Sequence, residues 1–141
     1  MKNMLSLFAT VLLLVTYSCN NEGIDENGCL SIIIDEDLFE NGAQDASTVI
    51  NSVKVEEKCL IISLSYTGGC ESHDIKFVTN GFESLSNPPI WYFKLIHDNN
   101  DPCEAILTED WEYDLNSLNH QSGYLELDIE GYDINIVVEL N

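Results

Sequence analysis

Two cysteines and two histidines are the residues of this chain whose types and spacing most readily support chemistry. Cys70 stands three residues before His73, and His97 stands six residues before Cys103. Thiolates and imidazoles together bind Zn²⁺ or a copper ion in a Cys₂His₂ set. Two thiols in an oxidising compartment form a disulfide instead. The four residues therefore indicate a metal site, a crosslink, or both kinds of chemistry side by side.

The two histidines belong to segments with the two-residue period of β-strands. His73 begins one segment, residues 73–79, and His97 ends another, residues 90–97, and each shares the parity of its segment's apolar side chains. If the segments pair antiparallel across the intervening loop, their outer ends meet. We then expect His73 and His97 at the same sheet edge, with Cys70 and Cys103 just beyond them.

Three arrangements of this cluster are compatible with the sequence. In the first, Cys70 and Cys103 form a disulfide, which stabilises the fold by about 3–4 kcal/mol on the chain-entropy model, and the histidines are structural neighbours. In the second, all four residues bind Zn²⁺ or copper. In the third, the disulfide forms and the two histidines make a weaker metal site or a pH-sensitive site, with help from Asp74 or Asp98.

The remaining cysteines favour a second disulfide between Cys29 and Cys59. A pairing of Cys59 with Cys70 is disfavoured, because an extended strand over residues 60–66 would hold their ends more than about 20 Å apart, whereas a disulfide needs Cα atoms within about 7 Å. That leaves Cys19 as the odd member of five cysteines, which calls for an explanation in an exported protein.

The first residues have the pattern of a secretory signal. Lys2 is followed by an almost unbroken apolar run, residues 4–15, which is too short to span a hydrocarbon core as a helix. Thr16-Tyr17-Ser18-Cys19 then resembles the lipobox of bacterial lipoproteins, although Thr16 and Tyr17 depart from its usual residues. The resemblance implies cleavage before Cys19 and lipidation of its thiol, so that a lipid attaches the protein to the outer membrane, facing the periplasm or the surface.

The acidic balance limits the possible partners. All 25 Asp and Glu follow Cys19, against four lysines and no arginine. Binding to nucleic acid requires clustered basic residues, and this chain has none to cluster. The negative electrostatic field of the chain favours binding to cationic partners or neutral glycans, or simply keeps the protein soluble. Residues 19–28 are polar and acidic and are predicted to be a flexible tether.

From residue 29 onward, short segments with a two-residue period and turn residues between them predict one all-β domain over residues 29–141. We expect an antiparallel β-sandwich, Ig-like or jelly-roll-like, with a small barrel as the alternative. The expected strands are 30–34, 49–56, 60–66, 73–79, 90–97, 105–107, 111–115, 124–129 and 132–140. A single helical turn is expected at 45–50 or 115–119.

Other candidate sites carry weaker signals. The acidic stretches 35–37 and 98–101 offer oxygen ligands for Ca²⁺, although Asx-rich turns explain 98–101 as well. Trp91, Tyr92, Trp111 and Tyr113 could stack on sugars, and of these Tyr92 has the parity of a surface residue. The motifs of hydrolases, metalloproteases and phosphate-binding loops are absent from the sequence, and we expect no enzymatic activity.

The strings SYTGGCESHDIKF and HDNNDPCEAILTEDWEYDL resemble a motif in small uncharacterised lipoproteins of Bacteroidetes. The resemblance implies a source and a location and carries no assigned activity. The sequence therefore predicts a lipid-anchored, non-catalytic binding or accessory module of the cell envelope, with a protein or glycan ligand. The alternative is an envelope protein that binds zinc or copper through Cys70, His73, His97 and Cys103.

Overall fold

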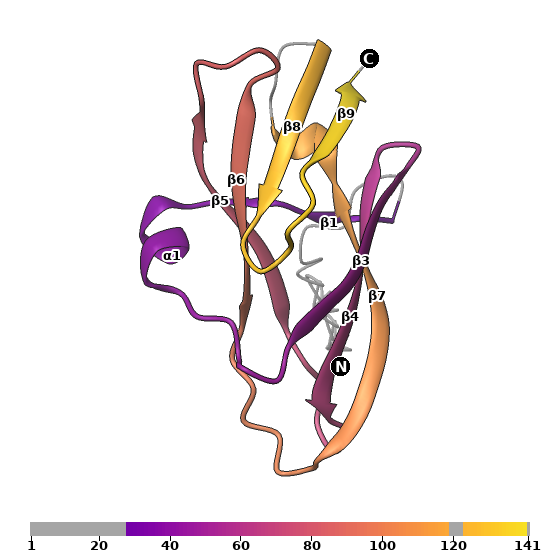
Figure 1. The fold of residues 1–141 in the computed structure, drawn as a ribbon. Helices are drawn as coiled ribbons and strands as arrows, with labels where there is room; N and C mark the ends of the chain where they lie inside the picture. Colours follow the sequence, from indigo (N-terminus) through magenta and orange to yellow (C-terminus); the bar gives the residue numbers. More distant parts are fainter. Residues whose placement is uncertain (1–27, 119–122, 141) are drawn as a thin grey trace, which may run out of the picture.

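The computed structural model describes residues 28–118 and 123–140, which form two β-sheets that face each other (Figure 1). The four-stranded sheet has the order β1 (Leu30–Ser31), β7 (Ala105–Asp114), β4 (Cys59–Gly68), β3 (Val49–Glu56). The five-stranded sheet has the order β2 (Ile33–Ile34), β5 (Ile75–Glu83), β6 (Ile90–His97), β8 (Gly123–Ile129), β9 (Ile136–Leu140). The predicted all-β sandwich is confirmed, and the described residues do not close into a barrel.

Both sheets are mixed, whereas a purely antiparallel sandwich was expected. β1 pairs parallel with β7, β2 with β5, and β6 with β8. The other pairs are antiparallel. The chain leaves the five-stranded sheet after β6, adds β7 to the other sheet and returns with β8, so β6 and β8 are not joined by a hairpin and are free to run in the same direction.

The strand predictions differ from the structure where the chain changes sheets. The predicted strand 30–34 divides at Ile32, which is buried in the core between β1 and β2. The predicted strands 105–107 and 111–115 form the single strand β7, because its acidic residues stand on an exposed sheet surface and do not interrupt pairing with β4. β9 begins at Ile136, later than predicted.

The core lies between the two sheets, and the strands build it by alternation. Inward residues of β4 and β8 are buried while their neighbours face outward. Phe77 and Phe93 stack across β5 and β6 with ring centroids 4.8 Å apart. Tyr113 reaches from β7 across the core, and its hydroxyl donates to the Ile75 carbonyl at 2.9 Å. The two sheets are therefore joined by both apolar packing and a buried hydrogen bond.

One short helix was not predicted. α1 (Glu36–Asn41) packs against β5, and η1 (Leu115–Leu118) is a single 3₁₀ turn at one of the two predicted places. The Asp35 side chain accepts from the Leu38 N–H at 2.8 Å, so it caps the helix N-terminus. Six residues hold too few turns to give a strong helical period in the sequence. The acidic stretch 35–37, predicted as a possible Ca²⁺ ligand set, belongs to the start of this helix.

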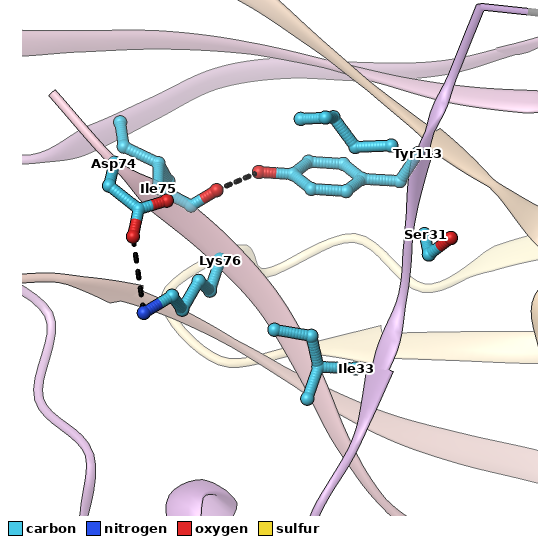
Figure 2. Close-up of a pocket in the computed structure, with 7 residues that line it drawn as sticks. Ser31, Ile33, Asp74, Ile75, Lys76 and Tyr113 are labelled. Carbon is cyan, nitrogen blue, oxygen red and sulfur yellow. Dashed lines mark hydrogen bonds and ion pairs between the residues drawn. The ribbon is translucent and has the colours of Figure 1, made fainter. Parts of the chain in front are cut away.

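The N-terminal strands cross from one sheet to the other on the side of the sandwich where β5 and β7 lie (Figure 1). Beneath this crossing is a hollow of about 320 Å³ between the sheets. Figure 2 shows Asp74, Ile75 and Lys76 on one side of it and Ser31 and Tyr113 on the other, with the Tyr113 ring reaching across toward Ile75.

The described residues contain no helix long and apolar enough to cross a membrane. The predicted signal segment, Cys19 and the tether up to residue 27 lie outside the described residues, so the structure does not test these predictions.

Candidate functional site

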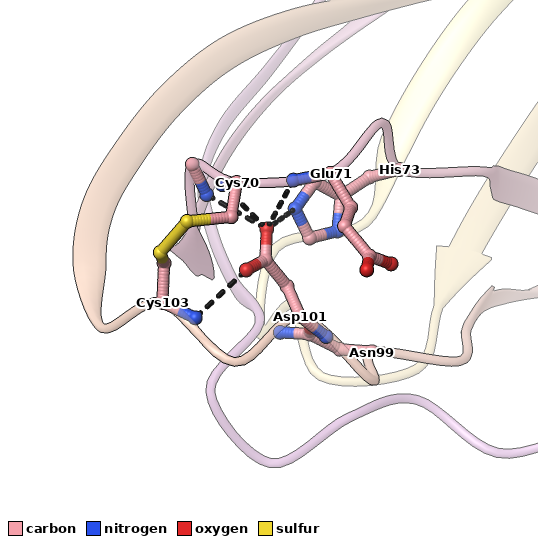
Figure 3. The surroundings of a disulfide bond; sticks show 7 residues. Cys70, Glu71, His73, Asn99, Asp101 and Cys103 are labelled. Carbon is pink, nitrogen blue, oxygen red and sulfur yellow. Dashed lines mark hydrogen bonds and ion pairs between the residues drawn. A yellow bond between two sulfur atoms is a disulfide. The ribbon is translucent and has the colours of Figure 1, made fainter.

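The cluster predicted from the sequence lies at one end of the sandwich, where two connections pass between the sheets. Residues 69–74 lead from β4 to β5, and residues 98–104 lead from β6 back to β7. A disulfide joins Cys70 in the first connection to Cys103 in the second, with Cα atoms 5.7 Å apart (Figure 3). The predicted crosslink is confirmed, and so is the second one, between Cys29 and Cys59.

Asp101 holds the two connections together from the inside. Its Oδ2 atom accepts the backbone N–H groups of residues 69, 70 and 71, each at 2.9 Å, and its Oδ1 atom accepts the Cys103 N–H at 2.8 Å (Figure 3). Burial raises the pKa of this carboxyl group, but the four backbone donors lower it more, to a net value of about 2. Asp101 is therefore an ionised carboxylate at neutral pH.

His73 and His97 meet directly behind this carboxylate. The antiparallel pairing of β5 with β6 sets Ile75 opposite His97, and His73, just before β5, brings its Nδ1 atom to 3.0 Å from Nε2 of His97. The other nitrogen of His73, Nε2, lies 3.3 Å from Asp101 Oδ2. The other nitrogen of His97, Nδ1, lies 2.7 Å from the Thr48 hydroxyl. The predicted meeting of the two histidines is confirmed.

The ionised carboxylate fixes the proton positions along this chain of groups. A lone pair on His73 Nε2 would repel Asp101, so Nε2 carries the hydrogen and Nδ1 accepts. His97 Nε2 must then donate to His73, and His97 Nδ1 accepts from the Thr48 hydroxyl. The contact of His73 Nε2 with Asp101 is electrostatic, since it lacks the alignment of a hydrogen bond.

The surroundings keep the imidazole pair away from solvent. His97 is 1% exposed and the side chain of His73 is 7% exposed. The Tyr66 ring packs against both imidazoles, with centroids 4.7 and 5.0 Å apart. A Cβ atom at Gly68 would stand 2.3 Å from His73 Nε2, so this position on β4 admits only glycine without a shift. Burial is the main cause that lowers the pKa of His97, and the neighbouring His73 lowers it further.

The two histidines lie together as the sequence predicts, but the acidic residues predicted beside them, Asp74 and Asp98, are not their partners. Asp74 forms an exposed ion pair with Lys76 at 3.1 Å, and Asp98 accepts from the Asn100 side chain. Neither hydrogen-bonds with the imidazoles, and Asp101 and Thr48 occupy those places. Asp101 could have been found as the first residue of the Asp-Pro-Cys turn. Thr48 gave no local signal, since it lies 49 residues from His97.

The residues of two predicted metal sites have other partners in the structure. The Cys70 and Cys103 sulfurs are joined to each other, so they do not offer the thiolates that the Cys₂His₂ set requires. In the stretch 98–101, the carboxylate and amide groups are occupied by turn contacts, and Asn99 donates to the Thr67 carbonyl at 2.8 Å. An Asx-rich turn accounts for this stretch.

The predicted aromatic residues separate into core and surface. Trp91 and Tyr113 are buried, Trp111 is partly buried, and Tyr92 is 40% exposed. Tyr92 stands on the outward surface of the five-stranded sheet beside Asp128 of β8. On the same surface, Tyr124 of β8 faces Glu139 of β9, and Glu126 faces Val137. We name this surface the outer aromatic face; its members are Tyr92, Tyr124, Val137, Glu126, Asp128 and Glu139.

The fold and this cluster define a class: an exported all-β sandwich whose connections are clamped by disulfides. No protein-family model matches the sequence, and no curated protein matches it either. Solved structures with the same fold come from Bacteroidetes. A NigD-like immunity protein from Bacteroides caccae has a TM-score of 0.53 at 16% identity. A toxin-related protein from Parabacteroides distasonis has a TM-score of 0.51 at 17% identity, and a protein of unknown function from Bacteroides vulgatus has 0.53 at 10%.

Each match covers 79% of this chain, but only 58% of the Bacteroides caccae chain, 60% of the Parabacteroides distasonis chain and 56% of the Bacteroides vulgatus chain. The chain therefore spans less than two thirds of the structures that it resembles. At these identities the likeness establishes the sandwich fold, and it agrees with the predicted similarity to small proteins of Bacteroidetes.

Proposed function

We propose that this chain is a lipid-anchored, non-catalytic module of the bacterial envelope that binds a cationic protein through the outer aromatic face. The observation that carries the proposal is the gathering of exposed apolar side chains and carboxylates on one sheet surface. Tyr124 is 58% exposed and Val137 is 59% exposed, and both stand on the outward surface of the five-stranded sheet, where grouped apolar side chains mark an interaction surface.

The charge of the molecule indicates the kind of partner. Glu126, Asp128 and Glu139 alternate with the exposed side chains on this face, and the whole chain has a formal charge of −20. Aromatic side chains with acidic neighbours fit a surface that presents lysine or arginine among apolar groups, because ring faces and carboxylates both attract cations. Complementary charge also speeds the encounter of two proteins.

The buried cluster supports a role without catalysis. Thr48, His97, His73 and Asp101 are ordered as a hydroxyl, imidazoles and a carboxylate, as in a nucleophile relay. However, Thr48 is only 6% exposed, and its hydroxyl is enclosed with the imidazoles rather than presented to a substrate. The cluster serves to clamp the sandwich end. The likeness to the NigD-like immunity protein is compatible with an accessory role of this kind.

Site-directed photo-crosslinking in the producing bacterium tests the proposal. The change Tyr124→p-benzoylphenylalanine places a crosslinker on the outer aromatic face, and Ser52→p-benzoylphenylalanine places one on the exposed surface of β3 as the matched control. We expect a discrete protein adduct at position 124 alone, with a partner rich in lysine or arginine by mass spectrometry. Equal adducts at both positions, or an acidic partner, would contradict the proposal. If the purified chain instead binds neutral glycans, and changes at the same residues weaken that binding, the ligand is a sugar rather than a protein.

A further inference from the structure

A second surface lies on the side of the sandwich where β7 borders the four-stranded sheet. β7 pairs with β4 along its whole length, from Ala105 to Asp114. On its other side, β1 pairs only with Tyr113 and Asp114. Among the described residues, the stretch 105–112 therefore has no strand on the side away from β4 (Figure 1). Such an edge presents a row of backbone N–H and C=O groups that a further strand can bond.

The neighbouring sheet is open on the same side. β2 pairs with β5 only at Val78 and Thr79, so within the described chain the beginning of β5 also lacks a partner there. The hollow of about 320 Å³ lies between these two edges, lined mainly by apolar groups that include Leu30, Ile33 and Ile75 (Figure 2). A strand added to β7 would point alternate side chains toward the space between the sheets. The opening therefore offers both backbone bonds and an apolar recess.

Charge restricts what can occupy this edge. β7 carries Glu109, Asp110 and Glu112 but no lysine or arginine. Lys76, which lines the hollow, is already paired with Asp74 at 3.1 Å. Antiparallel pairing of β7 with β7 of a second copy would bring like charges together, which destabilises a sheet. The occupant that fits is an extended segment with cationic side chains.

The geometry points to strand addition at the β7 edge: an extended segment of a partner polypeptide pairs with residues 105–112. Its lysine or arginine side chains face the Asp110 and Glu112 surface, and its alternate apolar side chains enter the space above the hollow. This site is distinct from the outer aromatic face, since it uses the other sheet and backbone groups rather than exposed rings.

A peptide experiment tests this site on the mature chain carrying Cys19→Ser. The probe is the peptide KVKVKVKV with blocked ends, and the readouts are its Kd and hydrogen exchange of the β7 amides. We expect slower exchange of those amides of residues 105–112 that do not bond to β4. The same peptide with a central Val→Pro change keeps its charge but loses a backbone donor, and we expect it to give no such protection.

Charge-reversal variants separate strand addition from general attraction to an acidic protein. Asp110→Lys with Glu112→Lys, on the outward surface of β7, should weaken binding of KVKVKVKV about tenfold, because two attractive charge pairs become repulsive. Glu40→Lys with Glu57→Lys makes the same change in net charge at exposed positions outside both proposed surfaces and should leave the Kd and the protection unchanged.

Three results would overturn the inference: equal loss of affinity in both double variants, protection by the proline peptide, or protection of residues 105–112 at high protein concentration without peptide, which would identify a second copy as the occupant. The outcome is independent of the crosslinking result at Tyr124, so failure of one leaves the other standing.

Discussion

At the scale of residues, a pair of imidazoles is tolerated inside this sandwich because each ring nitrogen faces a group of the complementary role. Thr48 donates to His97, His97 donates to His73, and His73 faces the Asp101 carboxylate. Buried polar groups are costly when they lack partners. The same arrangement makes the cluster sensitive to protons, since a second hydrogen on either ring would remove an acceptor from the chain.

The pH dependence of stability follows from the lowered pKa of His97. His97 faces His73 and Asp45, and Asp98 and Asp74 act on it more weakly. The unfolded chain takes up a proton near pH 6.5, before the folded chain does, so the free energy of unfolding falls as the pH drops below about 6.5. The slope should approach about 1.4 kcal/mol per pH unit for one proton.

We expect His97→Gln to flatten this slope between pH 7 and pH 5, as measured by urea midpoints across that range. Thr48→Val is the matched control, because it removes the hydroxyl donor but keeps the imidazole of His97, and its slope should persist. An unchanged slope in His97→Gln would show that the histidines do not govern stability in this range.

At the scale of elements, the end of the sandwich is held by two connections rather than by strand pairing. The connections 69–74 and 98–104 cross between the sheets at one end (Figure 1). The disulfide links them covalently, and Asp101 links them through four backbone hydrogen bonds. Removal of one link should therefore loosen the other.

The double variant Cys70→Ser with Cys103→Ser should lower the free energy of unfolding by about 3–4 kcal/mol, because it frees a loop of 33 residues in the unfolded chain. It should also speed hydrogen exchange of the amides at 69–71. Cys29→Ser with Cys59→Ser opens a loop of similar size, 30 residues, and should cost a similar amount without faster exchange at 69–71. Faster exchange there in both variants would mean that the clamp is not local.

At the scale of the whole molecule, the two disulfides identify an exported, non-cytoplasmic protein. The four cysteines that the structure describes are all used in them. This leaves Cys19 as the cysteine for the proposed lipid anchor, and it leaves no thiolate pair for the alternative metal site.

Intact mass and thiol counts of the protein purified from membranes test this assignment together. We expect a mature chain beginning at Cys19 with added acyl mass, no reactive thiol in denaturant without reductant, and no stoichiometric zinc or copper by elemental analysis. Cys19→Ser should release the protein from the membrane fraction. Two free thiols accompanied by one metal ion per chain would favour the Cys₂His₂ alternative instead.

Local pattern alone determined a large part of this protein. Alternation placed the strands 49–56 and 90–97 at their observed bounds, and parity placed both histidines on the inner side. These properties depend on residues next to each other in the chain, which is why the sequence reveals them. Cysteine parity and strand length likewise favoured the two disulfides, but they left a Cys₂His₂ metal site open at Cys70 and Cys103.

Tertiary structure alone decided the rest. The division of the first strand at Ile32, the parallel pairing of β6 with β8, and the choice of Asp101 and Thr48 as partners of the imidazoles depend on which distant segments share a layer. The open edge of β7 belongs to this group as well, because strand neighbours follow from the order of strands in the sheet. A residue's own neighbours in sequence fix which way it points, whereas its partners across the core are fixed by the path of the whole chain.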